Sequence, residues 1–406
     1  MTKPPIDLDD ALARLLADLA PLPATEGVAL GDASGRVTAA APRAATAVPP
    51  FANSAMDGYA VAASDPLHAA GGPFRVVETI YAGRAPTRSL EAGTCARIFT
   101  GAPLPPGADA IVAQEDAGVG DDGVRFRARP APGRFVRAAG GDVTAGAELV
   151  APGTRLHAGH LALLAAAGVE RVEVRRRPRL ALITSGDELR MPGEPLAPGQ
   201  IHDSTRFALP ALAAALPVTP AAPIHAADDP VALRRAFTAA AEDADALLTT
   251  GGVSVGDADH VRAVLAQEGR IDFWRLALKP GRPFAYGRFL GRPFFGLPGN
   301  PVSSLVTFLL LVRPALLTLA GVRDVAPPRL RLRLAGAVRK APGRRDFQRA
   351  RLEADGRASA FDRQDSNVLS VLAAADVLLD LPRGAGDLPA DTEVDAIDLR
   401  GLLGPL

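Results

Sequence analysis

Between residues 180 and 320, short apolar runs that read as strands alternate with helical stretches, and this alternation constrains the fold more than any other feature of the sequence. Strands are predicted at 180–184, 245–250, 273–278 and 293–297, and helices at 230–241, 258–267 and 302–320. Strands that alternate with helices predict a largely parallel sheet that is covered by helices on both faces. Ligands of such sheets bind at the carboxyl ends of the strands, so functional residues are expected in the loops that follow them.

The loop after the strand at 245–250 carries the densest chemical signal. Residues 249–260 read Thr-Thr-Gly-Gly-Val-Ser-Val-Gly-Asp-Ala-Asp-His. A strand, a glycine-rich turn and a helix N-terminus present unpaired backbone N–H groups, which suits a phosphate. The acids Asp257 and Asp259 suggest that the phosphate arrives with a divalent cation, because carboxylates and phosphate oxygens share Mg²⁺ well. A tight turn with Asp257 as helix cap is the alternative, and the loop alone does not decide between them.

Two further acidic loops are predicted in the same layer. Ser185-Gly-Asp-Glu-Leu189 follows the strand at 180–184, and Asp228 and Asp229 precede the helix at 230–241. Each loop taken alone is explained by a solvated helix cap. Three acidic loops around a predicted phosphate-binding turn favour a metal-assisted site.

Two proline- and glycine-containing turns follow the later strands. In Lys279-Pro-Gly-Arg-Pro283 the prolines and the glycine stiffen a turn with two cations, which could hold a substrate anion, although an ordinary surface turn remains an equal alternative. In Leu297-Pro-Gly-Asn-Pro301, Asn300 is a candidate N-cap and Pro301 a first helical residue.

The flanking segments have a different pattern. Residues 74–143 contain short β-like runs between Gly and Pro turns and predict a β-rich lobe. An amphipathic helix is predicted at 7–20 and a short apolar helix at 160–168. After residue 327, period-two runs predict a small β domain or barrel.

Composition narrows the class of protein. A chain of 406 residues predicts about two to four domains. Lys+Arg 45 and Asp+Glu 45 cancel, so neither nucleic acid nor a membrane is expected as a partner. The single Cys95 excludes intramolecular disulfides. No signal peptide is read, and the longest apolar run, 305–312, is too short to span a bilayer, so a cytoplasmic location is expected.

Five motifs occur in one order along the chain: Ser54-Ala-Met-Asp-Gly-Tyr-Ala60, Ser185-Gly-Asp-Glu-Leu189, Thr250-Gly-Gly-Val-Ser-Val-Gly256 with Asp259, Lys279-Pro-Gly-Arg-Pro283 and Leu297-Pro-Gly-Asn-Pro301. Together they resemble the molybdopterin molybdenumtransferase family, whose fold also forms the C-terminal part of gephyrin. The resemblance implies Mg²⁺-dependent insertion of molybdate into adenylylated molybdopterin with release of AMP. It also implies an elongated homodimer, and contacts with other proteins of molybdenum cofactor biosynthesis.

The resemblance further implies a division of the chain into five segments. These are an N-terminal helix and scaffold segment at 1–48, an inserted β-rich lobe at 49–146, a returning scaffold segment at 147–178, a molybdopterin-binding α/β domain at 179–325 and a C-terminal β-barrel at 326–406.

The resemblance also assigns site residues. Catalytic roles are implied for Asp57, Glu188, Asp228, Asp259 and Lys279, and Mg²⁺ is implied at Glu188, Asp228 and Asp259. Asp57 is implied to reach the pocket from the partner subunit. Cofactor-binding residues are implied at Thr100, Asp142, Ser185, Gly186, Asp187, Gly251, Gly252, Ser254, Gly256, Arg282, Pro298, Gly299, Asn300, Arg345, Arg349 and Ser366.

The sequence departs from the family at several positions. Ala52 replaces an Asp, Gly141 a Glu and Thr205 an Asn, and 364–367 match only loosely. Two alternatives stay open: the related molybdopterin adenylyltransferase, and a non-catalytic scaffold like gephyrin. The adenylyltransferase usually has a Gly-Gly-Thr-Gly loop and the α/β domain alone, whereas a scaffold does not need the acidic loops.

Overall fold

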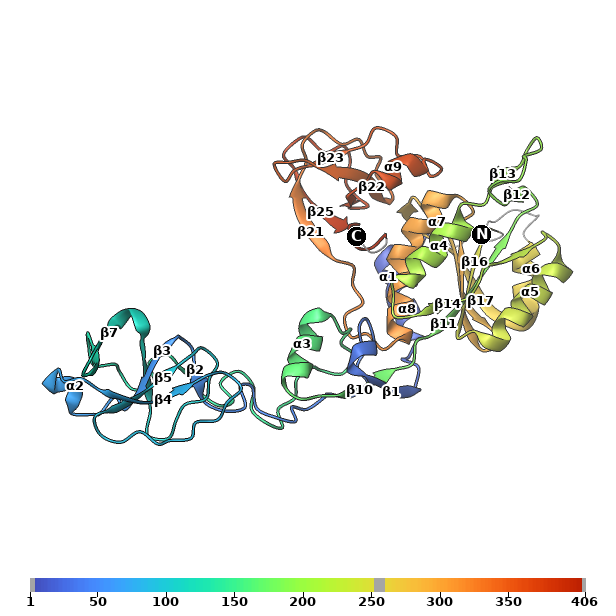
Figure 1. Cartoon of the computed structure of the whole chain (residues 1–406). Coiled ribbons are helices and arrows are strands. Elements are labelled where there is room, and N and C mark those ends of the chain that lie inside the picture. The colour runs from blue at the N-terminus through green and yellow to red at the C-terminus, as the bar shows by residue number, and fades with distance from the viewer. Residues whose placement is uncertain (1–3, 252–259, 404–406) are drawn as a thin grey trace.

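The computed structural model describes residues 4–251 and 260–403, and the chain is elongated (Figure 1). A β-rich lobe lies at one end. A narrow connection leads from the lobe to a small region around α3 (Ala158–Ala166), and the α/β sheet and the C-terminal strands lie beyond it.

The central element is a seven-stranded sheet. Its order is β14 (Thr219–Pro220), β11 (Arg179–Ser185), β16 (Ala246–Thr250), β20 (Arg292–Leu297), β19 (Pro283–Phe289) and β17 (Gly269–Arg275), and β15 (Ile224–Ala226) also pairs with β11. The pairs from β14 to β20 are parallel, which confirms the predicted parallel arrangement for this half.

The other edge of the sheet is antiparallel, and here the sequence interpretation was wrong. Strand β19 was not predicted, and β17 begins earlier than the predicted strand at 273–278. β19 and β20 form a hairpin in which Phe289 pairs with Arg292. The two turn residues, Leu290 and Gly291, both have positive φ values of 46° and 79°, as a tight two-residue turn requires. A leucine at such a position is uncommon, so the turn carries no recognisable signal.

Helices cover both faces of the sheet, as predicted. Alternate residues of β11 point to opposite faces, with Leu180 and Leu182 in one core and Ala181 and Ile183 in the other. The first core contains α1 (Leu8–Ala17), α4 (Thr205–Ala214), α7 (Pro301–Thr307) and α8 (Arg313–Leu319). The second contains α5 (Pro230–Asp243) and α6 (His260–Glu268). Asp229 caps α5 by accepting hydrogen bonds from the N–H groups of Val231 and Ala232.

The predicted helix at 302–320 is confirmed as α7 and α8, joined by a π-type stretch η3 (Phe308–Val312). Pro314, which has no N–H for the preceding turn, follows this stretch. The whole of Pro301–Leu319 is long and apolar enough to cross a membrane by length and composition alone. However, 89% of that window is buried inside the protein, as in a core helix.

The β-rich lobe contains a four-stranded sheet in the order β4 (Arg75–Ile80), β5 (Thr94–Ile98), β3 (Gly58–Val61) and β6 (Ala110–Ala113). Shorter elements surround it: β2 (Asn53–Ser54), α2 (Leu67–Ala70), η2 (Gln114–Asp116), β7 (Ala117–Gly120), β8 (Gly123–Phe126) and β9 (Val136–Arg137). Cys95 is fully buried in this lobe, consistent with a packing role.

The segments on either side of the lobe return to one another. β1 (Thr25–Ala29) pairs antiparallel with β10 (Arg171–Arg175), next to η1 (Leu30–Asp32) and α3. The predicted helices at 7–20 and 160–168 are confirmed as α1 and α3, and Asp7 caps the first.

The C-terminal strands form a six-stranded sheet. Its order is β18 (Leu278–Lys279), β22 (Arg345–Leu352), β24 (Val377–Leu381), β25 (Glu393–Asp398) and β21 (Arg329–Arg333), with β23 (Ala358–Ala360) paired to β22. A bridge between Leu334 and Ala358 joins the β21 and β23 ends. Because β18 precedes this segment in the sequence but pairs with β22, it connects the α/β part to the C-terminal part.

Candidate functional site

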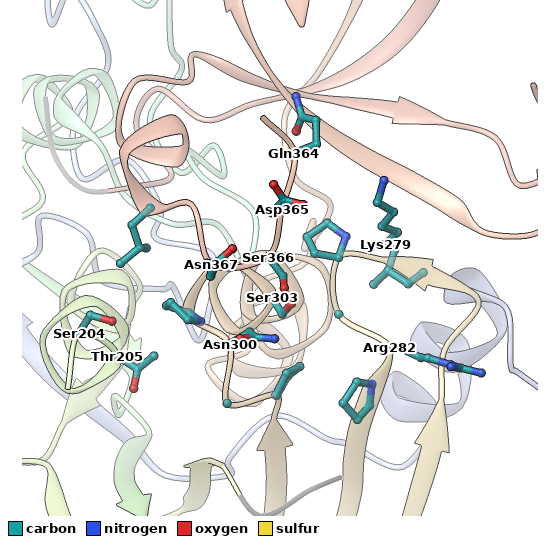
Figure 2. Close-up of a pocket in the computed structure, with 18 of the residues that line it drawn as sticks. Ser204, Thr205, Lys279, Arg282, Asn300, Ser303, Gln364, Asp365, Ser366 and Asn367 are labelled. Atoms are coloured by element: carbon teal, nitrogen blue, oxygen red, sulfur yellow. The ribbon is translucent and has the colours of Figure 1, made fainter. Parts of the chain in front are cut away.

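A cavity of about 1510 Å³ opens between the carboxyl ends of the parallel strands and the C-terminal segment. The α/β part contributes the ends of β11, β16 and β20, and the turn after β18. The C-terminal part contributes loops before and after β22 and β23, and α9 (Leu369–Ala373) follows them. Figure 2 shows Gln364, Asp365, Ser366 and Asn367 facing Asn300 and Ser303 across this space.

The loop after β11 brings Ser185 and Glu188 to the cavity. Gly186 has a φ of 142°, which favours glycine. A Cβ atom at this position would lie 2.5 Å from the Oε2 of Glu188. A larger residue here would displace the Glu188 carboxylate, which folds back against the loop.

The ends of three neighbouring strands meet closely. Gly251, at the end of β16, has a φ of 82°, and a Cβ there would lie 2.9 Å from the backbone oxygen of Ser185. A Cβ on Gly299, after β20, would be 3.9 Å from the Cα of Gly251. The cavity is lined by five of the predicted site residues from these strand ends: Ser185, Gly251, Pro298, Gly299 and Asn300. The predicted site residues Gly252, Ser254, Gly256 and Asp259 lie outside the described residues.

The acidic loops after β11 and β15 also lie together. The backbone N–H of Asp228 donates to the Oδ1 of Asp187 at 3.2 Å. Glu188 lines the cavity, whereas Gly186, Asp187 and Asp228 do not. Carboxylates are suitable Mg²⁺ ligands, so the type of donor fits the expected metal. Within residues 4–251 and 260–403, however, three His, Cys, Asp or Glu side chains do not gather closely enough to hold a metal.

Lys279 and Arg282 bring positive charge to the cavity. The Nζ of Lys279 lies 3.4 Å from the Oδ2 of Asp346, and the exposed guanidinium of Arg282 has no protein partner among the described residues. Between them, Gly281 has a φ of 106°, and a Cβ there would overlap with the hydroxyl of Thr307. The backbone N–H of Leu276 closes the turn by donating to the carbonyl of Arg282 at 2.7 Å.

Asn300 occupies the N-cap position of α7, but its side chain makes no capping hydrogen bond. The side chain instead lies toward the cavity (Figure 2). The backbone carbonyl of Ser366 accepts a hydrogen bond from the N–H of Val302 at 3.2 Å. The same helix N-terminus therefore holds the C-terminal segment over the strand ends.

Three predicted site residues lie on the β-rich lobe or its connection and do not line the cavity: Asp57, Thr100 and Asp142. The Oδ1 of Asp57 accepts two hydrogen bonds of 2.8 Å, from the backbone N–H and the hydroxyl of Thr100. These bonds, the backbone one first, hold the pKa of the Asp57 carboxyl below its usual range.

Arg345 and Arg349 lie near the cavity, but their guanidinium groups bind other residues of the protein. Arg345 binds Asp380 through two bonds of 2.6 Å and Asp9 at 2.9 Å, and the Asp380 carboxylate raises the pKa of Arg345. Arg349 is 1% exposed and donates to the side chain of Gln364 and to the carbonyls of Arg363 and Asp365. Arg349 therefore shapes the loop that carries Ser366.

Sequence reasoning missed several cavity residues. Arg339 and Arg344 line the cavity with exposed side chains, and within the described part of the chain neither guanidinium group has a hydrogen-bond or ion-pair partner. Asp203 and Gln348 are buried in its wall. Two features of the sequence could have pointed to these residues. Arg344 is next to the predicted Arg345, and Asp203 is close to Thr205, where the sequence departs from the family.

Comparison with known proteins matches three successive parts of the chain to family models. Residues 6–168 match the MoeA N-terminal region (domain I and II), 181–318 a probable molybdopterin binding domain, and 331–399 the MoeA C-terminal region (domain IV). A molybdopterin molybdenumtransferase of Haemophilus influenzae is 36% identical over 98% of this chain and 100% of its own. A molybdopterin molybdenumtransferase 2 of Mycobacterium tuberculosis is 37% identical over 92% of this chain and 94% of its own.

Solved structures agree with these sequence matches. A molybdopterin biosynthesis MoeA protein of Pyrococcus horikoshii OT3 superposes with a TM-score of 0.85 and 27% identity, covering 97% of this chain and 100% of that one. Another molybdopterin biosynthesis MoeA structure, from Pyrococcus horikosii, gives a TM-score of 0.78 at 31% identity and covers 97% of this chain and 99% of that one.

Proposed function

The chain belongs to the molybdopterin molybdenumtransferase family, and on that premise we propose that its cavity binds adenylylated molybdopterin and molybdate and releases AMP. The chain is an enzyme, a transferase of molybdenum cofactor biosynthesis that inserts molybdenum into molybdopterin. The observation that carries the proposed site is the single space shared by the strand-end loops and by two cations, Lys279 and Arg282.

The two sides of the cavity support different parts of the reaction. The close turns at Ser185, Gly251 and Gly299 would receive the phosphates, because glycine lets the backbone approach them. Lys279 and Arg282 would hold molybdate and neutralise charge as the phosphoric anhydride is cut. Arg344 and Arg339, which the resemblance did not assign, add cations on the C-terminal side.

We also propose that Glu188 and Asp228, with Asp259, hold Mg²⁺. The proximity of the Asp187 and Asp228 loops supports this assignment. When bound, Mg²⁺ would supply positive charge to the phosphate oxygens. The folded-back Glu188 side chain would keep its carboxylate at the cavity wall, where it could bind Mg²⁺.

The lobe residues support a homodimer with shared sites. Asp57 is held as an ionised carboxylate by Thr100, yet neither residue lines the cavity of its own chain. We propose that the lobe of a second copy brings this carboxylate to the cavity, and that Thr100 and Asp142 contribute to the same rim. The C-terminal strands are proposed to close into a small barrel, which the Leu334–Ala358 bridge supports. A cytoplasmic location and contacts with other proteins of the pathway are proposed from the family.

The two alternative functions are not favoured. Relatives that carry the molybdenumtransferase name match nearly the full length of this chain, whereas a molybdopterin adenylyltransferase would be expected to match the α/β part alone. A non-catalytic scaffold would not require free cations in a cavity of this size.

The test supplies adenylylated molybdopterin, Mg²⁺ and molybdate to the purified chain and follows AMP together with metal-loaded cofactor. We expect AMP release that depends on molybdate. Omission of molybdate is the control for simple hydrolysis. Equal AMP release with and without molybdate would overturn the proposed reaction.

A further inference from the structure

A buried carboxylate in the wall of the cavity has one unused oxygen. Asp203 lines the cavity and is 3% exposed. Its Oδ1 accepts hydrogen bonds from the hydroxyl of Thr205 at 2.9 Å and from the N–H of Arg206 at 3.0 Å. Its Oδ2 is buried and, among the described residues, has no hydrogen-bond partner. Buried carboxylate oxygens are normally satisfied, so this exception requires an explanation.

The position of Asp203 is fixed by its surroundings. Its backbone N–H donates to the carbonyl of Arg190 at 2.9 Å, next to the short paired strands β12 (Leu189–Arg190) and β13 (Ile201–His202). The hydroxyl of Thr205 is also 3.3 Å from that of Thr250 at the end of β16. Rotation of the carboxylate would break both bonds to Oδ1, so the free oxygen is held in place. A hydrogen-bond donor on a ligand would satisfy it without any rearrangement.

The wall around Asp203 is unsuited to a phosphate or a molybdate. A carboxylate repels such anions, and Glu188, whose backbone carbonyl accepts from the N–H of Ile201, adds a second carboxylate to this part of the cavity. The other groups that line it are His202 and hydroxyl and apolar side chains. Figure 2 shows Ser204 and Thr205 on one side of the cavity and Lys279 and Arg282 on the other. The cavity therefore has a cationic end that fits oxyanions and a carboxylate end that fits uncharged N–H groups.

From this arrangement we infer that Asp203 recognises the 2-amino-4-oxo-pyrimidine edge of the pterin. This inference rests on the proposed function and identifies which part of the substrate occupies which end. The edge presents an amino group beside a ring N–H, and a carboxylate oxygen with two lone pairs can accept from both. Adenine presents its amino group beside a ring nitrogen that accepts, so it matches the same oxygen less well.

The test compares two ligands that differ at the recognised group. The first, 6-hydroxymethylpterin, carries the 2-amino group, and the second, 6-hydroxymethyllumazine, carries a carbonyl oxygen in its place. We expect the wild-type chain to bind the pterin about tenfold or more tightly, because a donor to a buried carboxylate is exchanged for a repelled acceptor. Equal Kd values in the wild-type chain would overturn the inference without the need for any variant.

A variant tests the residue itself. Asp203→Asn presents an amide that can donate to the lumazine carbonyl, so the preference for the pterin should vanish or reverse. Glu194→Gln makes the same chemical change on an exposed residue outside the cavity and should keep the wild-type preference. Retention of the preference in a folded Asp203→Asn chain would contradict the assignment.

Two further measurements distinguish pterin from adenine as the group bound at Asp203, and distinguish failure of this inference from failure of the proposed function. The Kd values of AMP and IMP, which differ at the adenine amino group, should be unaffected by Asp203→Asn. Loss of a preference for AMP over IMP in that variant would place adenine at Asp203 and overturn the pterin assignment. If the wild-type chain discriminates between the two pteridines but shows no molybdate-dependent AMP release, the proposed function fails while the binding site stands.

Discussion

The Nζ of Lys279 lies 3.4 Å from the Oδ2 of Asp346, and this ion pair spans two parts of the chain. Lys279 belongs to β18 and Asp346 to β22, and the two residues are register partners in a parallel pair. Gln348 donates to the same Asp346 oxygen at 3.1 Å. A buried carboxylate of the C-terminal segment therefore positions a cation that we assign to the substrate oxyanion.

Replacing Lys279 should affect molybdate more than folding. Lys279→Gln removes a charge-assisted contact, so we expect the KM for molybdate to rise about tenfold or more. The Lys279 side chain is 43% exposed, and the buried Asp346 keeps its hydrogen bond from Gln348, so the Tm should change little. Arg331→Gln, which removes an exposed cation on β21, is the control and should leave the KM unchanged. An unaltered KM in Lys279→Gln would contradict its role.

Two glycines with similar backbone strain should differ in function. Gly186→Ala and Gly193→Ala both place a side chain at positive φ, and each should lower the free energy of unfolding by about 1–3 kcal/mol. Only at position 186 would the new Cβ meet the Glu188 carboxylate, since nothing lies within 4 Å of it at position 193. Turnover should therefore fall in Gly186→Ala alone, measured as AMP release. Equal turnover in the two variants would show that Glu188 is not part of the site.

Neighbouring arginines should have different phenotypes. Arg345→Gln leaves the 4%-exposed Asp380 with its pair to Arg329 as the one ion pair among the described residues, and should lower the free energy of unfolding by about 3 kcal/mol. Arg344→Gln removes an exposed cavity cation and should raise the KM for molybdate at unchanged Tm. Denaturant unfolding and steady-state kinetics of both variants check the contrast. If Arg345→Gln instead raised the KM and Arg344→Gln lowered the stability, Arg345 would be the substrate-binding residue and Arg344 the structural one.

The pH dependence should report the hydrogen bonds to Asp57. Because Thr100 lowers the pKa of Asp57, the ionised form persists to a lower pH, and activity that needs it is lost as the pH falls through this lowered pKa. Thr100→Val removes the hydroxyl bond and should move the acidic limb of the pH–rate profile to higher pH. Thr87→Val removes a similar 2.8 Å bond to Glu78 in the same lobe and should leave the profile unmoved. An unshifted limb in Thr100→Val would mean that Asp57 does not limit the reaction.

Mixed dimers test whether the lobe acts on a second copy. At molybdate concentrations below the wild-type KM, Asp57→Ala and Lys279→Gln chains should each have low activity alone, and should recover about one quarter of wild-type activity when mixed. Half of the dimers are then mixed, and one of the two cavities in each retains both residues. Absence of recovery, with mixed dimers shown to form by mass spectrometry, would count against a shared site.

Local patterns in the sequence were sufficient for much of the fold. The apolar runs and their spacing predicted the parallel strands and the covering helices, because burial on both faces leaves a clear pattern in each element. The antiparallel edge was missed because Leu290 and Gly291 form its turn without the usual Asn-Gly or Asp-Gly pair. Pairing between β18 and β22 links residues that are 67 positions apart, and no local pattern reports it.

The candidate site was predictable to the extent that motifs fix backbone geometry. Ser185, Gly251 and Gly299 meet because each lies at the end of a strand of one sheet. Lys279 reaches the cavity from β18, which pairs with β22 of the C-terminal sheet. Arg344 lines the cavity in place of the predicted Arg345, because Asp380 binds the Arg345 side chain. This pairing is a tertiary contact. The unused oxygen of Asp203 becomes visible only when every neighbouring donor has been placed.

The position of the bound molybdate tests the central claim most directly. Crystals grown with AMP and molybdate, with data collected at the molybdenum absorption edge, would locate the metal by its anomalous signal. We predict a peak within hydrogen-bonding reach of Lys279 and Arg282, facing Ser366 inside the cavity. A peak elsewhere on an enzyme that is active in solution would contradict the account.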